Sequence, residues 1–227
     1  MPQPSSAPDA VRALLDSAEA VLFDFNGTLS LDEDLMARLY ADAAREVCGL
    51  ELTPEEYGER FVGLSDPDIC AALASGDERL AARILDHLCG AYLREIRREP
   101  RIPAAHVALV RELVAAGTRV AVVTGTLRRL LEPALEDSGL SGLISATVCS
   151  DDVERGKPDP EGFLRGAELL GAPAAATVVF EDSLAGVAAA RAAGMRCVLV
   201  GPLATATPAT GAPAEVHPLG ELAALAA

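Results

Sequence analysis

The chain has 227 residues, of which 50% are hydrophobic and only 4% aromatic, so its core must be built mainly from Ala, Leu and Val. Its formal net charge is -15, from 19 basic and 34 acidic residues. This balance argues against a nucleic-acid partner, because binding to a phosphate backbone depends on a basic surface. We therefore expect a protein whose ligands are small molecules.

The five cysteines are widely spaced and form no CxxC pair, which predicts reduced thiols and not disulfides. Residues 1–16 contain neither a basic segment nor an apolar segment of the kind found in signal peptides. No run of about 18 apolar residues follows them, which is the length a membrane span requires. We expect a cytoplasmic protein with no membrane partner.

A short helix is expected over residues 11–18, which carry apolar side chains at helical spacing. The first strand, residues 21–23, is apolar and ends at Asp24, after which the chain turns through residues 26–28. An unpaired carboxylate at the end of a buried strand is costly unless it is neutralised. Asp24 should therefore meet a metal ion, a lysine, or both.

Between residues 31 and 103 every apolar pattern has helical spacing. Asp32, Glu33 and Asp34 stand at the beginning of the first of these helices, where the helix dipole favours negative charge. A solvated helix start is their simplest interpretation, although their place at the hinge into this region leaves another role open. Two further helices are predicted to begin after the N-cap residues Thr53 and Ser65.

From residue 104 onward, helices alternate with short apolar strands. After the last of these strands, residues 201–213 are predicted to be mostly loop, and a short helix is possible from Leu219 to the end. This alternation predicts an α/β fold with a doubly wound (Rossmann-like) parallel sheet core made of residues 1–30 and 104–227, and an all-helical cap of residues 31–103. The expected strands cover 119–123, 143–149, 177–180 and 197–200, and the helices 107–116, 127–138, 160–170 and 185–193.

Polar residues that carry chemistry stand at four places along this pattern. Asp24 opens the first, Thr124 and Gly125 follow the second strand, Lys157 lies in a later loop, and Glu181-Asp182 follow a further strand. Singly, these are ordinary features: a strand-end cap, a turn, a surface loop and a helix N-cap. Together, and in this order, they favour one site at the carboxyl ends of the strands.

This order of motifs resembles the haloacid-dehalogenase-like (HAD) superfamily, and specifically its β-phosphoglucomutase-like branch, which has a helical cap inserted after the first motif. The resemblance extends from about Val21 to Val200, and its most specific parts are Gly156-Lys157-Pro158 and Glu181-Asp182-Ser183 with Gly186. It implies a phosphatase or phosphoryl-transfer hydrolase that acts on a small phosphorylated metabolite through an aspartyl phosphate.

The resemblance also implies roles for single residues. Asp24 would be the nucleophile, and Lys157 would neutralise it together with the charge that develops on the phosphoryl group. Mg²⁺ would be held by Asp24, by the backbone carbonyl of Asn26 and by Asp182, with Glu181 as a further ligand or bound through water. The phosphate-binding residues would be Gly27, Thr28, Thr124, Gly125 and Lys157.

Asn26 departs from the family pattern, in which an aspartate at this position protonates the leaving group and then activates water. An amide cannot exchange a proton usefully, and the loss of general acid-base help costs roughly 10² to 10⁴ in rate. One interpretation is a slow or specialised phosphatase, whose substrate has a good leaving group or whose proton comes from Asp32 or Glu33.

Two other functions remain open at this point. One is a binding or regulatory protein that captures a phosphorylated ligand without turnover. The other is a dehalogenase, which is disfavoured because family dehalogenases use no Mg²⁺ site and the pair Glu181-Asp182 suits one.

Two features of the helical region have alternatives of their own. Gly63-Leu64-Ser65 resembles the cap loop that reaches into the site in this branch, and a plain connection between helices fits equally well. The arginines at 94, 97, 98 and 101 could hold a phosphorylated substrate, but they lie at a predicted helix C-terminus, where cations are favoured anyway. A solvated surface is their preferred interpretation.

Overall fold

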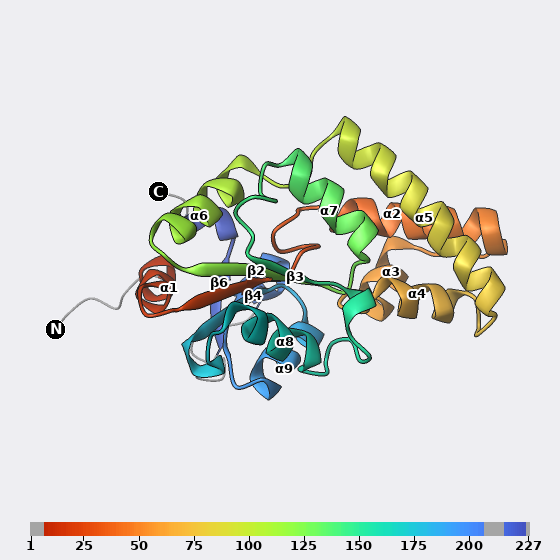
Figure 1. Ribbon diagram of the computed structural model, residues 1–227. Helices are drawn as coiled ribbons and strands as arrows, with labels where there is room; N and C mark the ends of the chain where they lie inside the picture. The colour runs from red at the N-terminus through yellow and green to blue at the C-terminus, as the bar shows by residue number, and fades with distance from the viewer. Residues whose placement is uncertain (1–6, 207–215, 226–227) are drawn as a thin grey trace.

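The computed structural model describes residues 7–206 and 216–225. Within these residues six parallel strands form one sheet in the order β3-β2-β1-β4-β5-β6, with helices on both faces (Figure 1). The strands are β1 (Ala20–Phe23), β2 (Arg119–Val123), β3 (Ala146–Val148), β4 (Thr177–Glu181), β5 (Arg196–Val200) and β6 (Val216–Gly220). The predicted doubly wound parallel core is therefore confirmed.

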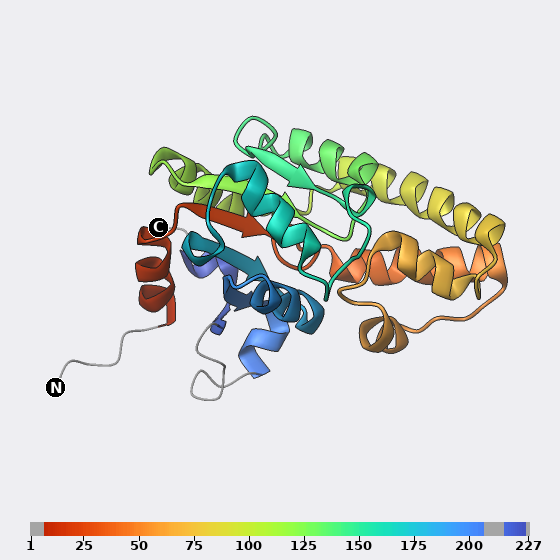
Figure 2. The same ribbon diagram turned by 60° about the horizontal axis from the view of Figure 1, so that its bottom comes forward.

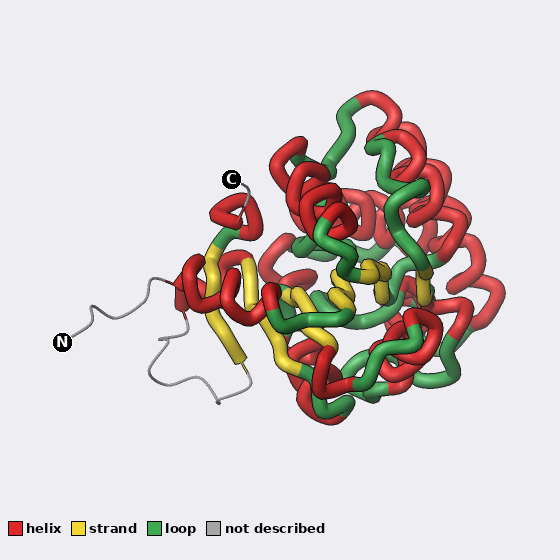
Figure 3. The backbone as a smooth tube through the Cα atoms, turned by 60° about the vertical axis from the view of Figure 1, so that its left-hand side comes forward, coloured by secondary structure: helices red, strands yellow, loops and turns green. Residues whose placement is uncertain are grey.

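The residues of each central strand alternate between two hydrophobic layers, as the pleat requires. Val21 and Phe23 pack in the layer of α1 (Ala7–Asp16), α6 (Ala104–Ala115) and α7 (Arg128–Asp137). Ala20 and Leu22 pack on the other face against α8 (Glu161–Leu170) and α9 (Leu184–Ala192). Figure 3 shows the strands between these two sets of helices. Burial on both faces explains why the strands read as continuous apolar runs.

The chain passes outward from β1 to β2 and β3, and then returns to the opposite side of β1 as β4, β5 and β6. The strand order thus reverses beside β1. In doubly wound sheets the crevice at such a reversal, outside the carboxyl ends of the strands, is where ligands bind. The fold places the residues after β1 and β4 in this crevice.

Between β1 and α6 every regular element is helical. Thr53 and Ser65 cap two of the helices through their hydroxyl groups, and Thr53 also forms a capping box with Glu56. These helices lie beyond the tips of the strand arrows (Figure 2). The division into a core and a cap at residues 31 and 103 stays a prediction. The elements are α2 (Glu33–Ala43), a π-helical turn (Ala44–Cys48), α3 (Pro54–Arg60), α4 (Asp66–Leu73) and α5 (Glu78–Arg98).

The end of the chain differs from the prediction. A short helix, α10 (Gly201–Ala206), stands at the start of the predicted loop, and β6 covers the residues where the helix from Leu219 was expected to begin. Among the described residues that follow β6, the regular element is a 3-10 turn (Leu222–Leu225). Residues 207–213 of the predicted loop lie outside the described residues. Strand β6 escaped notice because it contains Pro218, which lacks a donor for the ladder and is tolerated at a sheet edge.

Three smaller observations complete the description of the fold. The predicted strand over 143–149 is shorter in the structure, where β3 covers Ala146–Val148. All five cysteines are free, and four of them are buried. In the described part of the chain, no helix has both the length and the apolar character needed to cross a bilayer.

Candidate active site

The register of the sheet brings the predicted site residues together. Strand β1 pairs with β4 so that Phe23 lies opposite Phe180, and Asp24 therefore leaves the sheet beside Glu181. The backbone N–H of Asp24 donates to the carbonyl of Phe180 at 2.9 Å, which fixes this end of the strand. Strand β2 lies on the other side of β1 and ends just before Thr124.

Lys157 joins the ends of β1 and β4. Its ammonium group forms ion pairs with Asp24 and with Glu181, both of which are buried. The same nitrogen lies 5.1 Å from the centre of the Phe163 ring. Burial alone would lower the pKa of Lys157, but the two carboxylates raise it above its ordinary value. Lys157 is therefore a permanent cation beside the Asp24 carboxylate.

Glu181 is held from all sides. Its Oε2 accepts hydrogen bonds from the backbone N–H groups of Asp182 at 2.9 Å and Ser183 at 2.8 Å, and from the Ser183 hydroxyl at 2.9 Å. Its Oε1 accepts a hydrogen bond from the Lys157 ammonium group. A side chain at Gly186 would overlap this carboxylate, because its Cβ would lie 1.8 Å from Oε1. Both oxygens of Glu181 are thus committed, and a direct metal bond would require it to release one.

Three carboxylates converge at the site, and one lysine faces them. One oxygen from each of Asp24, Glu181 and Asp182 lies within 4.8 Å of the others. Burial raises the pKa of Asp24 to about 7, although Lys157 opposes the rise. Burial and then the Asp24 charge raise the pKa of Asp182 to about 9. Such a set of oxygen donors with uncompensated charge fits a hard divalent cation such as Mg²⁺.

Gly27 and Thr28 support Asp182. Gly27 has φ of 75°, and a Cβ there would lie 2.0 Å from Asp182 Oδ2, so only glycine allows this turn. The Thr28 hydroxyl is buried and donates to Asp182 Oδ1 at 3.3 Å. The side chain of Thr28 therefore points to a carboxylate, and its predicted contact with phosphate stays a prediction.

Asn26 has both ends of its side-chain amide engaged. Nδ2 donates to Asp32 Oδ2 at 3.1 Å, and Oδ1 accepts from the Thr126 hydroxyl. Asp32 is fully buried and also accepts from the Tyr92 hydroxyl at 2.8 Å. The interpretation of Asp32 as a solvated helix start is therefore wrong. Asn26 and Tyr92 both donate to its Oδ2, whereas its Oδ1 is buried and has no hydrogen-bond partner among the described residues.

Glu33, which was named with Asp32 as a possible proton source from the sequence, lies in the site. It lines a cavity of about 40 Å³ together with Asp24, Asn26 and Asp182. Its Oε2 is buried and has no hydrogen-bond partner in the described part of the chain. Burial, and then the charge of Asp32, raise the pKa of Glu33 to about 8. Acids in a first helical turn are usually solvated, so its position gave no signal of this environment.

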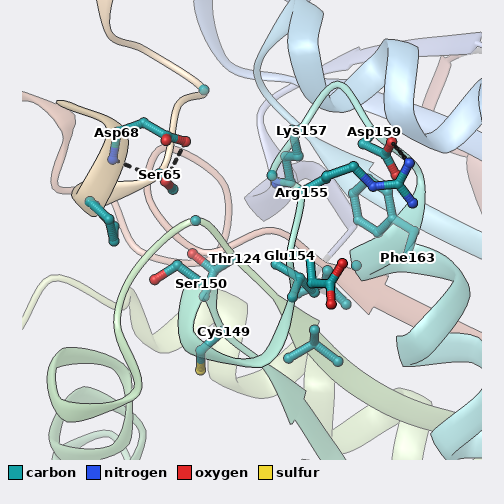
Figure 4. Close-up of a pocket in the computed structure, with 18 residues that line it drawn as sticks. Ser65, Asp68, Thr124, Cys149, Ser150, Glu154, Arg155, Lys157, Asp159 and Phe163 are labelled. Carbon is teal, nitrogen blue, oxygen red and sulfur yellow. Dashed lines mark hydrogen bonds and ion pairs between the residues drawn. The ribbon is translucent and has the colours of Figure 1, made fainter. Parts of the chain in front are cut away.

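Residues 63–65 bring the helical region against the core. The backbone N–H of Asp66 donates to the carbonyl of Gly125 at 3.0 Å. A Cβ at Gly125 would lie 3.0 Å from the carbonyl oxygen of Leu64, so the approach is close. A second cavity, of about 200 Å³, lies beside the first and also touches Gly63, Thr124, Gly125 and Lys157 (Figure 4). The loop is thus more than a connector, because it lines both cavities.

Comparisons with known proteins agree with this geometry. The model of a family described as haloacid dehalogenase-like hydrolase matches residues 18–194. Validoxylamine A 7'-phosphate phosphatase of Streptomyces hygroscopicus subsp. limoneus is 35% identical over 185 residues, which cover 79% of this chain and 84% of that protein. The chloroplastic protein SUPPRESSOR OF QUENCHING 1 of Arabidopsis thaliana is 36% identical over 190 residues, or 80% of this chain, but the match spans only 18% of that protein.

A solved structure is similar over almost its whole length. The crystal structure of a CbbY mutant from Rhodobacter sphaeroides in complex with xylulose-(1,5)-bisphosphate matches with a TM-score of 0.76 and 26% sequence identity. The match covers 92% of this chain and 99% of that one. The likeness therefore includes the helical region as well as the sheet.

Proposed function

This chain belongs to the haloacid dehalogenase-like hydrolases, in their phosphatase branch, and from that premise we propose that it is a Mg²⁺-dependent phosphatase acting on a small phosphorylated metabolite. The observation that carries the proposal is the convergence of Asp24, Lys157 and Asp182 where β1 and β4 end. A carboxylate can attack an anionic phosphoryl group only where neighbouring cations cancel the repulsion.

The residues around Asp24 suit a divalent cation. Asp24, Asp182 and the backbone carbonyl of Asn26 would hold Mg²⁺, with Glu181 behind them as the anchor of Lys157. When bound, the ion would withdraw charge from the phosphoryl oxygens and keep the nucleophile ionised. The buried acidic cluster supports this assignment, because without a cation it would carry several mutually repelling carboxylates.

The proposed reaction has two steps at Asp24. Its carboxylate oxygen attacks phosphorus, the bond from phosphorus to the leaving oxygen breaks, and an aspartyl phosphate forms. Water then attacks the phosphorus of this acyl phosphate, the bond from phosphorus to the Asp24 oxygen breaks, and inorganic phosphate is released as the Asp24 carboxylate is regenerated. Lys157 neutralises the charge that develops, and Thr124 with the backbone N–H of Gly125 holds the phosphoryl oxygens.

The leaving oxygen needs a proton that Asn26 cannot supply. We assign this role to Glu33, because it lines the same cavity as Asp24 and one of its oxygens has no partner in the described residues. Glu33 would give its proton to the leaving oxygen and then take one from the attacking water. Asp32 also has an oxygen without a partner among the described residues, Oδ1, but it is less suited because Asn26 and Tyr92 hold its Oδ2 and it does not line the cavity.

One observation favours a second function, the capture of a phosphorylated ligand without turnover. Asn26 carries an amide, which does not exchange protons as a carboxyl group does, and both ends of that amide are held by hydrogen bonds with Thr126 and Asp32. If Glu33 does not act in place of the missing aspartate, metal and phosphate binding would persist while hydrolysis would be slow.

A metal-dependent screen separates these functions. The purified chain and an Asp24→Ala control are incubated with Mg²⁺ and a panel of phosphomonoesters that includes acetyl phosphate. Phosphate release that exceeds the control and stops with a chelator supports the phosphatase. Saturable binding without release identifies the capture protein instead. Absence of both overturns the proposal, and chloride release that a chelator does not affect would point to a dehalogenase.

A further inference from the structure

The second cavity, called the outer cavity from here on, is where the part of the substrate other than its phosphate would bind. It has a volume of about 200 Å³ and lies between residues 63–68 of the helical region and residues 149–159 of the core (Figure 4). It shares Thr124, Gly125 and Lys157 with the cavity of Asp24, so a phosphate bound at Asp24 would place the rest of its molecule there. Pockets for drug-sized ligands have about 300 to 1,000 Å³. This one suits a smaller group, of the size of one ring.

The cations of the two linings already have partners. Among the described residues that line either cavity, only Lys157 and Arg155 carry positive charge. Lys157 is paired with two buried carboxylates. The Arg155 guanidinium is paired with Asp159 at 3.2 Å and with Glu161 at 3.4 Å. The arginines at the end of α5 lie outside both linings. A second anionic group on the ligand would therefore have to compete with acidic residues that already pair with these two cations, of which Arg155 is exposed.

Two carboxylates of the outer cavity have no cationic partner in the described part of the chain. Asp68 comes from the helical region, is exposed, and accepts a hydrogen bond from the Ser65 hydroxyl at 2.6 Å. Glu154 comes from the core side and is also exposed (Figure 4). Ser150 lines the same cavity, and its hydroxyl oxygen has no hydrogen-bond partner among the described residues. Carboxylates and hydroxyls accept hydrogen bonds from hydroxyl and ammonium groups, and carboxylates repel other anions.

We propose that the substrate is a monophosphate whose remaining part is a single polyhydroxylated ring, neutral or positively charged, and that a second phosphate or a carboxylate on this ring is selected against. This inference rests on the proposed function, because it assumes that the phosphate binds at Asp24. It separates this chain from its structural relative CbbY, whose crystal structure holds a bisphosphate. The second phosphate of such a ligand would face Asp68 and Glu154 here.

Three sugar phosphates that differ in charge test the inference. Glucosamine 1-phosphate, glucose 1-phosphate and glucuronic acid 1-phosphate are titrated into the full chain with Mg²⁺ by calorimetry, which records binding whether or not they are hydrolysed. We expect the first two to bind at least about tenfold more tightly than the third. Comparable or tighter binding of glucuronic acid 1-phosphate overturns the inference, and so does absence of binding by all three. Phosphate release from acetyl phosphate decides the proposed function separately.

A matched pair of variants locates the effect in the cavity. Glu154→Gln removes one of the uncommitted charges, so the affinity ratio between glucosamine 1-phosphate and glucuronic acid 1-phosphate should fall about threefold or more. Glu112→Gln removes the same charge from a cavity near the start of β2, at the other end of the strands, and should leave the ratio unchanged. No change in Glu154→Gln, or an equal change in both variants, contradicts the assignment.

Discussion

The side-chain amide of Asn26 donates a hydrogen bond to the buried carboxylate of Asp32, with 3.1 Å between Nδ2 and Oδ2. An aspartate at position 26 would face Asp32 across the same short distance. Two carboxylates so close together in a buried site cannot both ionise without a large cost. The amide of Asn26 therefore stabilises the ionised form of Asp32, which an aspartate at position 26 would not do.

This pairing predicts how activity responds to an aspartate at position 26. Asn26→Asp alone should gain little hydrolysis near neutral pH, because Asp32 disfavours the ionised form that the second step needs as a base. The double variant Asn26→Asp/Asp32→Asn restores an amide donor to the new carboxylate and should raise the rate about 10²-fold. Steady-state hydrolysis of one phosphomonoester by all three proteins tests this. A single variant as active as the double one would show that the pairing has no influence.

The contribution of Glu33 to the rate of hydrolysis should depend on the leaving group of the substrate. Glu33→Gln removes the proposed acid, so hydrolysis of an alkyl phosphate should slow by about 10² or more, while acetyl phosphate, whose leaving group needs no proton, should be affected much less. Asp34→Asn changes the neighbouring exposed acid, which pairs with Arg101 at 3.4 Å, and serves as the control. A uniform loss across leaving groups would assign Glu33 a structural role instead.

Stability should depend on pH and on Mg²⁺ together. The pKa values of Asp24, about 7, and Asp182, about 9, lie above their ordinary value of 3.8. Without metal, the folded state therefore holds more protons than the unfolded state from the ordinary pKa of 3.8 up to the raised pKa of about 9. The free energy of unfolding should fall as pH rises through this range. Mg²⁺ binds the ionised carboxylates, so the stabilisation it gives should grow with pH.

Thermal unfolding at about pH 6 and about pH 8, with and without Mg²⁺, measures this coupling. At 100 times its dissociation constant, the ion adds about 2.7 kcal/mol to the free energy of unfolding. Asp182→Asn should abolish the effect of Mg²⁺, whereas Asp137→Asn, an exposed change on α7, should preserve it. An equal Mg²⁺ effect at both pH values would argue against these carboxylates as the ligands.

Gly186 should be irreplaceable for a reason unrelated to backbone conformation. It lies inside α9, where alanine normally adds up to about 1 kcal/mol of stability. Because its Cβ would lie 1.8 Å from Glu181 Oε1, Gly186→Ala should instead destabilise the fold by about 1 to 3 kcal/mol and displace Lys157. Gly58→Ala in α3, where no atom lies within 4 Å of the added Cβ, should be neutral or stabilising. Urea unfolding of both variants provides the comparison.

The sequence was most informative where polar residues follow apolar strands. Parallel strands end at the same edge of the sheet, so the positions of Asp24, Thr124 and Asp182 along the chain were enough to predict their convergence. Lys157 does not follow a strand directly, so this rule does not apply to it, and its place in the site was predicted from the resemblance to a family. The paired strand register then explains why Asp24 and Glu181 become neighbours.

The inward-facing acids could not be predicted in the same way. Asp32 and Glu33 have the local pattern of a solvated helix start, and only the tertiary contacts of Asp32 with Asn26 and Tyr92 reveal its burial. The commitment of Glu181 depends likewise on tertiary structure, because Lys157 binds its Oε1 and Ser183, the N-cap of α9, donates to its Oε2. Strand β6 was missed because Pro218 obscures its pattern.

The central claim is that Asp24 carries the phosphoryl group. Because Asn26 removes one source of acid-base help, the aspartyl phosphate should persist long enough to be trapped when the chain, mixed with Mg²⁺ and acetyl phosphate, is quenched in acid. Peptide mass spectrometry should then find one phosphoryl group on the segment containing Asp24, and none after chelation or in Asp24→Asn. Phosphate release that continues undiminished in Asp24→Asn, with no phosphoryl group on this segment, would contradict the account.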